Sequence, residues 1–217
     1  MQLLLDKGAD VNSQAVHYEN VLHAATVIGH QAIVKILLEN GADINTQVEH
    51  YGDVLQTAVC DRNEALVELL LDKGADVNAQ GGWHGNALQA AVRYGHQAIV
   101  KLLLATGADV NAQGGYYGDA LQAAARYGHK TIVKLLLDKG ANVNAQGGCY
   151  GNALQAAARY GHKTIVKLLL DKGADVNAEG GEYGNALSAA TQCGQDAIVQ
   201  LLLKHGAINV LPVGETL

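Results

Sequence analysis

Four histidines have a spacing that could support chemistry, because each follows a glycine and they stand whole multiples of 33 residues apart. They are His30, His96, His129 and His162. Imidazoles can bind a metal ion or transfer protons, whereas a structural histidine in a turn hydrogen-bonds to neighbouring backbone. A zinc ion needs every ligand within about 2.1 Å. Stacked helices lie roughly 8–10 Å apart, so successive histidines cannot share one ion, and the structural interpretation is favoured.

The glycine pairs and the cysteines lack the partners that catalysis would require. Gly-Gly begins at residues 81, 114, 147 and 180, but no lysine and hydroxyl follow as in a phosphate-binding loop, so turns are predicted. Cys60, Cys149 and Cys193 fall at different places in the 33-residue period and have no repeated base beside them. We therefore predict no catalytic residue, no enzyme activity, no metal site and no cofactor.

One position in every 33 changes freely and is a candidate for partner recognition. Its successive residues are His17, His50, Trp83, Tyr116, Cys149 and Glu182. Residues 114–146 and 147–179 differ at only four positions, and the most drastic change, tyrosine to cysteine, falls at this one. Packing therefore does not constrain this side chain. The alternatives are drift at an exposed loop tip and a recognition surface, and exposed Trp and Tyr favour recognition because aromatic side chains anchor many interfaces.

A second candidate set consists of adjacent arginine and tyrosine residues. The pairs are Arg93–Tyr94, Arg126–Tyr127 and Arg159–Tyr160. Arginine can hold a carboxylate by two hydrogen bonds, and tyrosine offers broad contact area at low entropy cost, so these pairs suit a partner with an acidic segment. The alternative is a ladder in which each tyrosine stacks on the next and stiffens the chain, and both can hold. Four more tyrosines recur regularly and are predicted to pack loops: Tyr51, Tyr117, Tyr150 and Tyr183.

The elements that position these residues follow from the 33-residue period, in which Gly-Ala recurs without insertion. Its glycines are Gly8, Gly41, Gly74, Gly107, Gly140, Gly173 and Gly206. Each unit opens with a residue suited to cap a helix, followed by a short apolar stripe. The first helices are predicted to begin near Asn20, Asp53, Asn86, Asp119, Asn152 and Asn185.

A turn, a second helix and a loop complete each unit. Gly128 can adopt the left-handed conformation that ends a helix, whereas Arg62 occupies the same place in its unit and is expected to be strained. Residues 132–137 are mostly apolar and predict a second helix with a wide apolar face. Val143–Asn144 is predicted to be extended and residues 146–148 to turn, which together make a hairpin-like finger. Two such short helices cannot bury their faces alone, so the units must stack.

Composition and charge exclude several classes of protein. The net charge is −6 and the pI is near 5.8, which argues against nucleic-acid or anionic-membrane binding because both need a basic face. No apolar run approaches the roughly 18 residues of a membrane span. The chain has no Phe and one Trp, so its core must consist of Leu, Ile, Val and Ala, which suits thin and closely spaced helices. Scattered cysteines and the lack of a visible signal peptide favour a cytoplasmic location.

The recurring sequence GH-x-x-IV-x-LLL-x-x-GADVNA resembles the second half of the ankyrin repeat, in register across essentially the whole chain. The first half departs from the usual T-P-L-H-x-A-A and reads N-A-L-Q-A-A after Gly85 and Gly151. This G-G-x-Y-G-N-A-L-Q style is similar to fungal arrays attached to NACHT-type, NLR-like proteins. The resemblance implies a mainly α ankyrin-repeat solenoid with β-hairpin-like fingers, in which the fingers and first helices line a concave groove that binds proteins.

We therefore expect one array over residues 1–217, with a partial repeat at 1–13, six helix pairs at 14–206 and a tail at 207–217. Because the chain opens on the end of a second helix, we expect it to be cut from a longer array. Its predicted role is that of a non-catalytic, monomeric scaffold that binds a protein partner, and the alternative is a spacer or self-association element. The predicted contact residues are Trp83, Arg93, Tyr94, Tyr116, Arg126, Tyr127, Cys149, Arg159, Tyr160 and Glu182.

Overall fold

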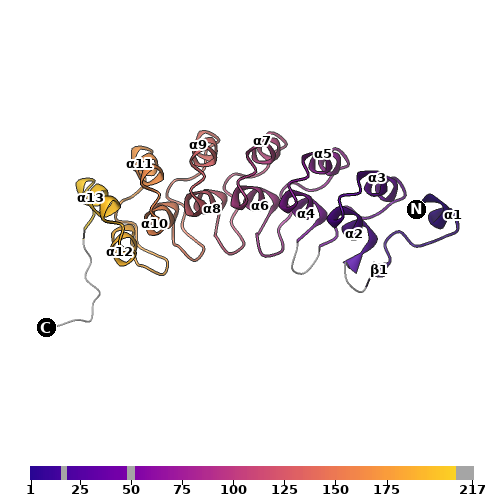
Figure 1. Cartoon of the computed structure of the whole chain (residues 1–217), viewed down its shortest axis with the longest axis horizontal. Helices are drawn as coiled ribbons and strands as arrows, with labels where there is room; N and C mark the ends of the chain where they lie inside the picture. The colour runs from indigo at the N-terminus through magenta and orange to yellow at the C-terminus, as the bar shows by residue number, and fades with distance from the viewer. Residues whose placement is uncertain (16–18, 48–51, 209–217) are drawn as a thin grey trace. The chain divides into compact units, whose positions relative to one another are not determined.

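The structure is a computed structural model that describes residues 1–15, 19–47 and 52–208. The described residues form thirteen helices and one two-stranded antiparallel sheet (Figure 1). His17, His50 and Tyr51 lie outside the described residues, as does the expected tail beyond residue 208. None of the helices in the described part of the chain has the length and apolar character of a membrane span.

Short first helices alternate with longer second helices. The first helices are α2 (Val21–Val27), α4 (Val54–Cys60), α6 (Ala87–Arg93), α8 (Ala120–Tyr127), α10 (Ala153–Arg159) and α12 (Ala186–Gln192). The second helices are α3 (Gln31–Glu39), α5 (Glu64–Asp72), α7 (Gln97–Ala105), α9 (Lys130–Asp138), α11 (Lys163–Asp171) and α13 (Asp196–Lys204). Helix α1 (Gln2–Asp6) precedes them, and strand β1 (Gln14–Ala15) pairs with β2 (Glu19–Asn20) ahead of α2. The predicted solenoid of helix pairs is confirmed.

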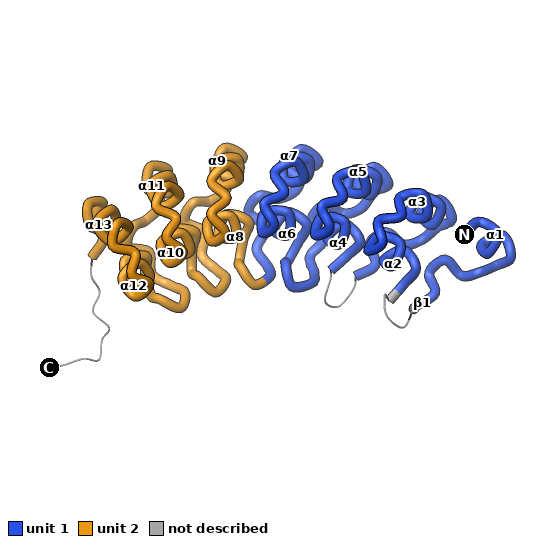
Figure 2. Tube along the Cα trace, in the orientation of Figure 1, with its two compact units in different colours: residues 1–115 blue, residues 116–217 orange. Residues whose placement is uncertain are grey.

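The chain divides into two compact units, residues 1–115 and residues 116–217 (Figure 2). Unit 1 contains the pairs α2–α3, α4–α5 and α6–α7, and unit 2 contains α8–α9, α10–α11 and α12–α13. Within each unit the first helices lie side by side in one row and the second helices in another (Figure 1). In unit 2 the fingers at residues 147–151 and 180–184 project beyond the row of first helices (Figure 1).

The six first helices begin where the sequence predicts. At each one the cap side chain accepts a hydrogen bond of 2.8–2.9 Å from the backbone N–H three residues further on. The caps are the predicted Asn20, Asp53, Asn86, Asp119, Asn152 and Asn185. Each bond pairs one of the N–H groups that a helix start leaves without a partner.

The turns between paired helices depend on a left-handed residue. Gly128 has a φ of 76° and follows α8, as the sequence predicts. Arg62 adopts a φ of 55° at the same place after α4, and it is the one non-glycine residue with positive φ in the described part of the chain. A side chain in this conformation costs roughly 1 kcal/mol, so the strain expected at Arg62 is present.

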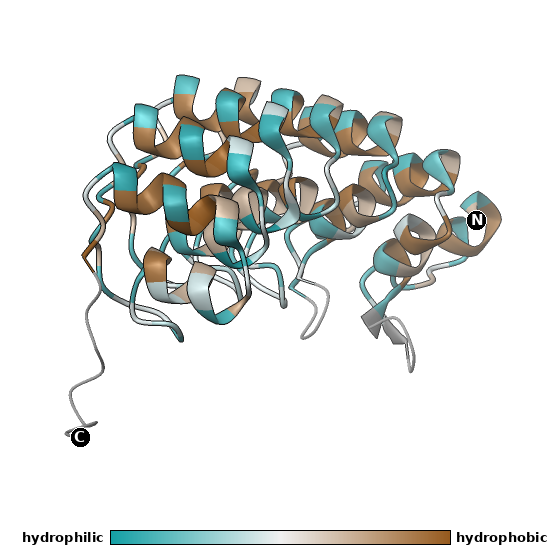
Figure 3. Cartoon of the chain, turned by 60° about the vertical axis from the view of Figure 1, so that its left-hand side comes forward, coloured by the Kyte–Doolittle hydropathy of each residue, from teal (hydrophilic) through white to brown (hydrophobic). Residues whose placement is uncertain are grey.

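First and second helices contribute differently to the core. Residues 120–125 of α8 are all buried, whereas α9 buries only Ile132, Val133 and Leu136. First helices are therefore enclosed, with alanines that allow close approach, and second helices turn a polar face outward. Figure 3 shows the apolar faces of the helices directed toward the neighbouring row.

The segment Val143–Asn144 is not extended as predicted but lies in a turn. The turn forms because the backbone N–H of Asn144 donates to the Oδ1 of Asn142 over 3.0 Å. The Asn144 side chain then joins this repeat to the next one: its Nδ2 donates to the Gly173 carbonyl, and its Oδ1 accepts from the Asp175 N–H. Short polar side chains favour such local bonds over a strand, which explains the wrong prediction.

The fingers are tight because glycine occupies their crowded positions. In unit 2 the backbone N–H of Gly147 donates to the Gly151 carbonyl over 2.9 Å. Gly148 has a φ of 58°, and a side chain there would collide with the backbone carbonyl of Tyr117 in the preceding repeat. Adjacent fingers thus stack closely, and the Glu182 N–H donates to the Cys149 carbonyl over 3.3 Å. Residues that follow the glycine pair consequently stand at the finger tips.

Candidate protein-binding surface

In unit 2, arginine and tyrosine side chains at the ends of α8 and α10 interlock with the adjoining fingers. We call the following residues the finger surface: Tyr116, Tyr117, Arg126, Tyr127, Cys149, Tyr150, Arg159, Tyr160, Glu182 and Tyr183. Seven of the ten predicted contact residues belong to it. The sequence therefore brings its two candidate sets together within this unit, as the resemblance implied.

Arg126 lies among four tyrosines of the finger surface, and Tyr127, Tyr150 and Tyr160 make its closest contacts. Its Nε donates a hydrogen bond of 2.6 Å to the Tyr150 hydroxyl. The centre of its guanidinium lies 4.4 Å from the ring centroid of Tyr127 and 4.8 Å from that of Tyr160. Partial burial opposes the charge, but the hydrogen bond to Tyr150 and the surrounding tyrosines outweigh it and raise the pKa of Arg126. The group is a fixed cation between aromatic faces.

Arg159 occupies the equivalent place one repeat later but has a carboxylate partner. Its Nη1 donates to the Glu182 Oε2 over 2.9 Å, and its guanidinium lies 4.6 Å from the ring centroid of Tyr183. The Glu182 side chain is 62% exposed at its finger tip. An ion pair with this exposure contributes at most about 1 kcal/mol to stability. Its main effect is that Glu182 takes up a hydrogen-bond donor of Arg159 that a ligand would otherwise use.

The remaining tyrosines divide into buried and exposed groups. Tyr117 and Tyr150 are buried, as predicted for loop packing, and their hydroxyls bond to those of Tyr127 at 2.6 Å and Tyr160 at 2.9 Å. Tyr116 is 47% exposed and its hydroxyl interacts with the Cys149 thiol. The inner rings thus have the contacts of a stiffening ladder, while the outer residues leave surface available to a partner.

Unit 1 carries a separate aromatic cluster at the end of α6. The guanidinium of Arg93 lies 4.5 Å from the ring centroid of Trp83 and 5.2 Å from that of Tyr94. Trp83 and Tyr94 are each close to half exposed. His84 contacts both rings edge-on, and Tyr94 also stacks on His96. The three predicted contact residues of unit 1 are therefore neighbours.

Sequence analysis missed His84. It stands where unit 2 has the buried Tyr117 and Tyr150, and this change of residue type in the repeat register is the signal that could have identified it. Burial and the nearby Arg93 lower the pKa of His84 to about 4, so its ring is neutral at physiological pH. The neutral ring can accept from Arg93, whose Nη1 lies 3.4 Å from the His84 Nδ1.

The recurrent turn histidines make local contacts. The Nε2 of His162 lies 2.9 Å from the Arg126 carbonyl of the preceding repeat, which is the contact expected of a structural histidine. Gln195, which takes the histidine position in the next repeat, donates to the Arg159 carbonyl over 3.4 Å. His129 stacks on Tyr127, and His30 is exposed. Among the described residues, no three His, Cys, Asp or Glu side chains are grouped as a metal site would require.

The cysteines differ in environment but are all unpaired thiols. Burial raises the pKa of Cys60 to about 11, which keeps it protonated and unreactive at physiological pH. Cys149 is half-buried on a finger, and Cys193 is exposed at the end of α12. The finger surface can offer cationic and aromatic contacts to a ligand.

Comparison with known proteins identifies the architecture. The family model described as "Ankyrin repeats (3 copies)" matches residues 1–81, 55–147 and 146–212. The human ASB11 ankyrin repeat domain, known from a crystal structure, shares 31% sequence identity with this chain, with a TM-score of 0.78 over 96% of this chain and 93% of that one. No curated protein matches the sequence significantly. As many as 579 chains of solved structures match, so the fold by itself does not specify a ligand.

Proposed function

The chain belongs to the ankyrin-repeat family, and from this premise we propose that it is a non-catalytic scaffold that binds a partner protein through its fingers and first-helix ends. Ankyrin repeats are generally protein–protein interaction scaffolds, and they are generally non-catalytic. The finger surface of unit 2 and the cluster around Trp83 supply the contacts. Each unit offers its own set of exposed aromatic side chains beside half-buried arginines.

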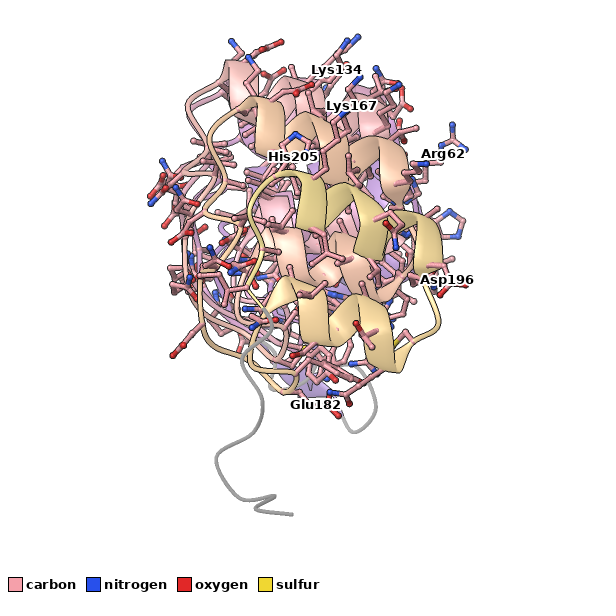
Figure 4. The ribbon with its side chains drawn as sticks, turned by 90° about the vertical axis from the view of Figure 1, so that its left-hand side faces the viewer. Arg62, Lys134, Lys167, Glu182, Asp196 and His205 are labelled. Atoms are coloured by element: carbon pink, nitrogen blue, oxygen red, sulfur yellow. The ribbon has the colours of Figure 1, made fainter. Side chains whose placement is uncertain are left out.

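One observation carries the proposal: exposed aromatic side chains and half-buried arginines collect at the fingers and the adjoining ends of the first helices, and the second helices contain no aromatic or arginine residue. In unit 2 the exposed face of α9 and α11 carries Lys134 and Lys167, which lie on the opposite side of the unit from Glu182 (Figure 4). Interfaces are enriched in Tyr, Trp and Arg and depleted in Lys. This asymmetry supports recognition on the finger side.

A structural spacer or self-association element is the second candidate. It is favoured by the hydrogen bonds that Arg126 and Tyr160 make to Tyr150, because a side chain engaged in such bonds already stiffens the array. The finger surface can do both, since its inner atoms are paired and its outer faces are exposed. Binding experiments with outer residues separate the two.

Finer features of the proposal come from the sequence. We propose one continuous array over residues 1–217, monomeric and cytoplasmic. The G-G-x-Y-G-N-A-L-Q style supports an origin in the recognition part of a fungal NACHT-type protein.

The test is a pull-down from cells of the source organism with matched variants. The double variants Trp83→Ala with Tyr116→Ala, and Arg126→Glu with Arg159→Glu, should each reduce capture of a partner at least tenfold. The reason is that an anchor side chain buried in a complex contributes about 2 kcal/mol to binding. Lys134→Glu with Lys167→Glu changes the outer face by the same charge and should leave capture unaltered. Circular dichroism confirms that each variant folds. A partner captured equally by all variants would support the spacer instead.

A further inference from the structure

The two arginines of the finger surface differ in a way that identifies a ligand. Arg126 and Arg159 stand at equivalent positions of repeats that are identical at all but four positions. Arg159 is paired with Glu182 of the following finger. Among the described residues, no carboxylate pairs with Arg126, because the finger tip that follows it carries Cys149 in place of glutamate.

The Arg159 pair shows how a carboxylate binds at this place. Glu182 reaches Arg159 from the tip of the finger, one of its oxygens accepts from the Arg159 Nη1, and the ring centroid of Tyr183 lies 4.6 Å from the guanidinium. At Arg126 the equivalent tyrosine, Tyr150, has its ring centroid 5.8 Å from the guanidinium and accepts a hydrogen bond from Nε through its hydroxyl. Finger stacking is also the same, because the Cys149 N–H donates to the Tyr116 carbonyl as the Glu182 N–H does to the Cys149 carbonyl.

Arg126 retains the donors that such a ligand needs. Its hydrogen bond to Tyr150 uses Nε, so both terminal amino groups have no hydrogen-bond partner within the described part of the chain. The flanking rings of Tyr127 and Tyr160 fix the plane of the guanidinium. A preorganised and half-buried cation without a counter-ion binds an anion more strongly than an exposed one, because less order is lost and less water competes.

We propose that Arg126, with Tyr116 and Cys149 at its rim, is the binding site for one aspartate or glutamate side chain of a partner protein. This inference rests on the proposed function and names the chemistry that the partner presents. The partner's carboxylate takes the place that Glu182 takes at Arg159. Arg159 is filled by its own chain, so unit 2 accepts one such side chain and not two.

Exchanging the two finger-tip residues tests the site directly. The probe is the peptide acetyl-Gly-Glu-Gly-amide, and its glutamine counterpart is the control. Binding is followed by the NMR shifts of the Arg126 and Arg159 Nε–H groups in the whole chain. In the unaltered protein the glutamate peptide should shift the Arg126 signal in a saturable manner, and the glutamine peptide should not. Cys149→Glu should fill the site internally and weaken binding at least tenfold.

The double variant Cys149→Glu with Glu182→Cys should move the response from Arg126 to Arg159. This exchange preserves charge and composition, and the wild-type repeats already contain both finger tips, so the fold is maintained. Equal shifts with the glutamine peptide, or a response at Arg126 that survives Cys149→Glu, would overturn the inference. Tighter binding of inorganic phosphate than of the glutamate peptide would overturn the assignment to a carboxylate.

The experiment needs no natural partner, so its outcome is separate from that of the pull-down. If the glutamate peptide gives no response but capture of a partner still depends on Trp83 and Tyr116, the carboxylate-site proposal fails and the scaffold proposal remains. A peptide response together with a partner indifferent to every finger-surface variant would remove the scaffold proposal instead.

Discussion

The helix pair α4–α5 in unit 1 and the pair α10–α11 in unit 2 are built on one repeat but present different surfaces. The turn after α10 contains Gly161 and His162 and is preceded by an arginine and a tyrosine. The turn after α4 contains Arg62 and Asn63 and is preceded by a cysteine and an aspartate. Both pairs bury the same positions of the repeat, so its frame tolerates a different surface charge at this turn.

Charge differs in the same sense between the whole units. Residues 1–115 contain 13 Asp and Glu against 6 Lys and Arg, whereas residues 116–217 contain 8 against 9. An acidic partner is therefore repelled by unit 1 and not by unit 2. This supports the proposal that a carboxylate is recognised at the finger surface of unit 2.

The largest expected effect of a single substitution is on protein stability, at the cap residues of helices α4 and α10. Asp53 caps α4 and Asn152 caps α10. Burial raises the pKa of Asp53 from 3.8 to about 6, so the folded chain holds this proton more tightly than the unfolded chain. The charged form weakens the fold, and its cost grows as pH rises from about 4 through 6. Asp53→Asn should therefore stabilise the protein at pH 7.5 by about 3 kcal/mol and have little effect at pH 4.

Thermal denaturation followed by circular dichroism at the two pH values measures this effect. Asn152→Asp is the matched control and should destabilise the protein at pH 7.5. A lower melting temperature for Asp53→Asn at pH 7.5 would show that the helix dipole stabilises the charged carboxylate of Asp53 more than burial destabilises it.

The second prediction concerns local opening. Residues 1–63 should exchange amide hydrogens at least about tenfold faster than residues 86–170, because α1 has no buried residue and Arg62 is strained. Hydrogen exchange followed by mass spectrometry measures the two regions together. Arg62→Gly should relieve roughly 1 kcal/mol of strain and slow exchange in α4 and α5, whereas Gly161→Ala should accelerate it in α10 and α11. Equal protection in both regions of the unaltered protein would remove the argument.

The comparison also shows what sequence can supply. Caps and turns were predictable at Asn152 and Arg62, because each depends on a residue type at a local position. The contacts of Arg126 were not, since its partner Tyr150 lies 24 residues further on and is brought near by the stacking register. Asn144 was assigned the wrong conformation because the Asn142 side chain, which accepts from the Asn144 backbone N–H, decides the turn. Local features such as caps and turns could be predicted from the sequence, whereas side-chain contacts between repeats could not.

The smallest expected effect is that of removing metal ions. His162 contacts a backbone carbonyl, and Gln195 makes the equivalent contact one repeat later although glutamine is a poor zinc ligand. The contact at this position therefore needs a side chain that forms a hydrogen bond and does not need a metal ion. In the turn after α4 the same position holds Asn63. EDTA should leave the melting temperature unchanged. His162→Gln should change the free energy of unfolding by less than about 1 kcal/mol, the typical value of one hydrogen bond. A drop on adding EDTA that zinc reverses, and that His162→Gln abolishes, would show that the turn histidines hold a metal.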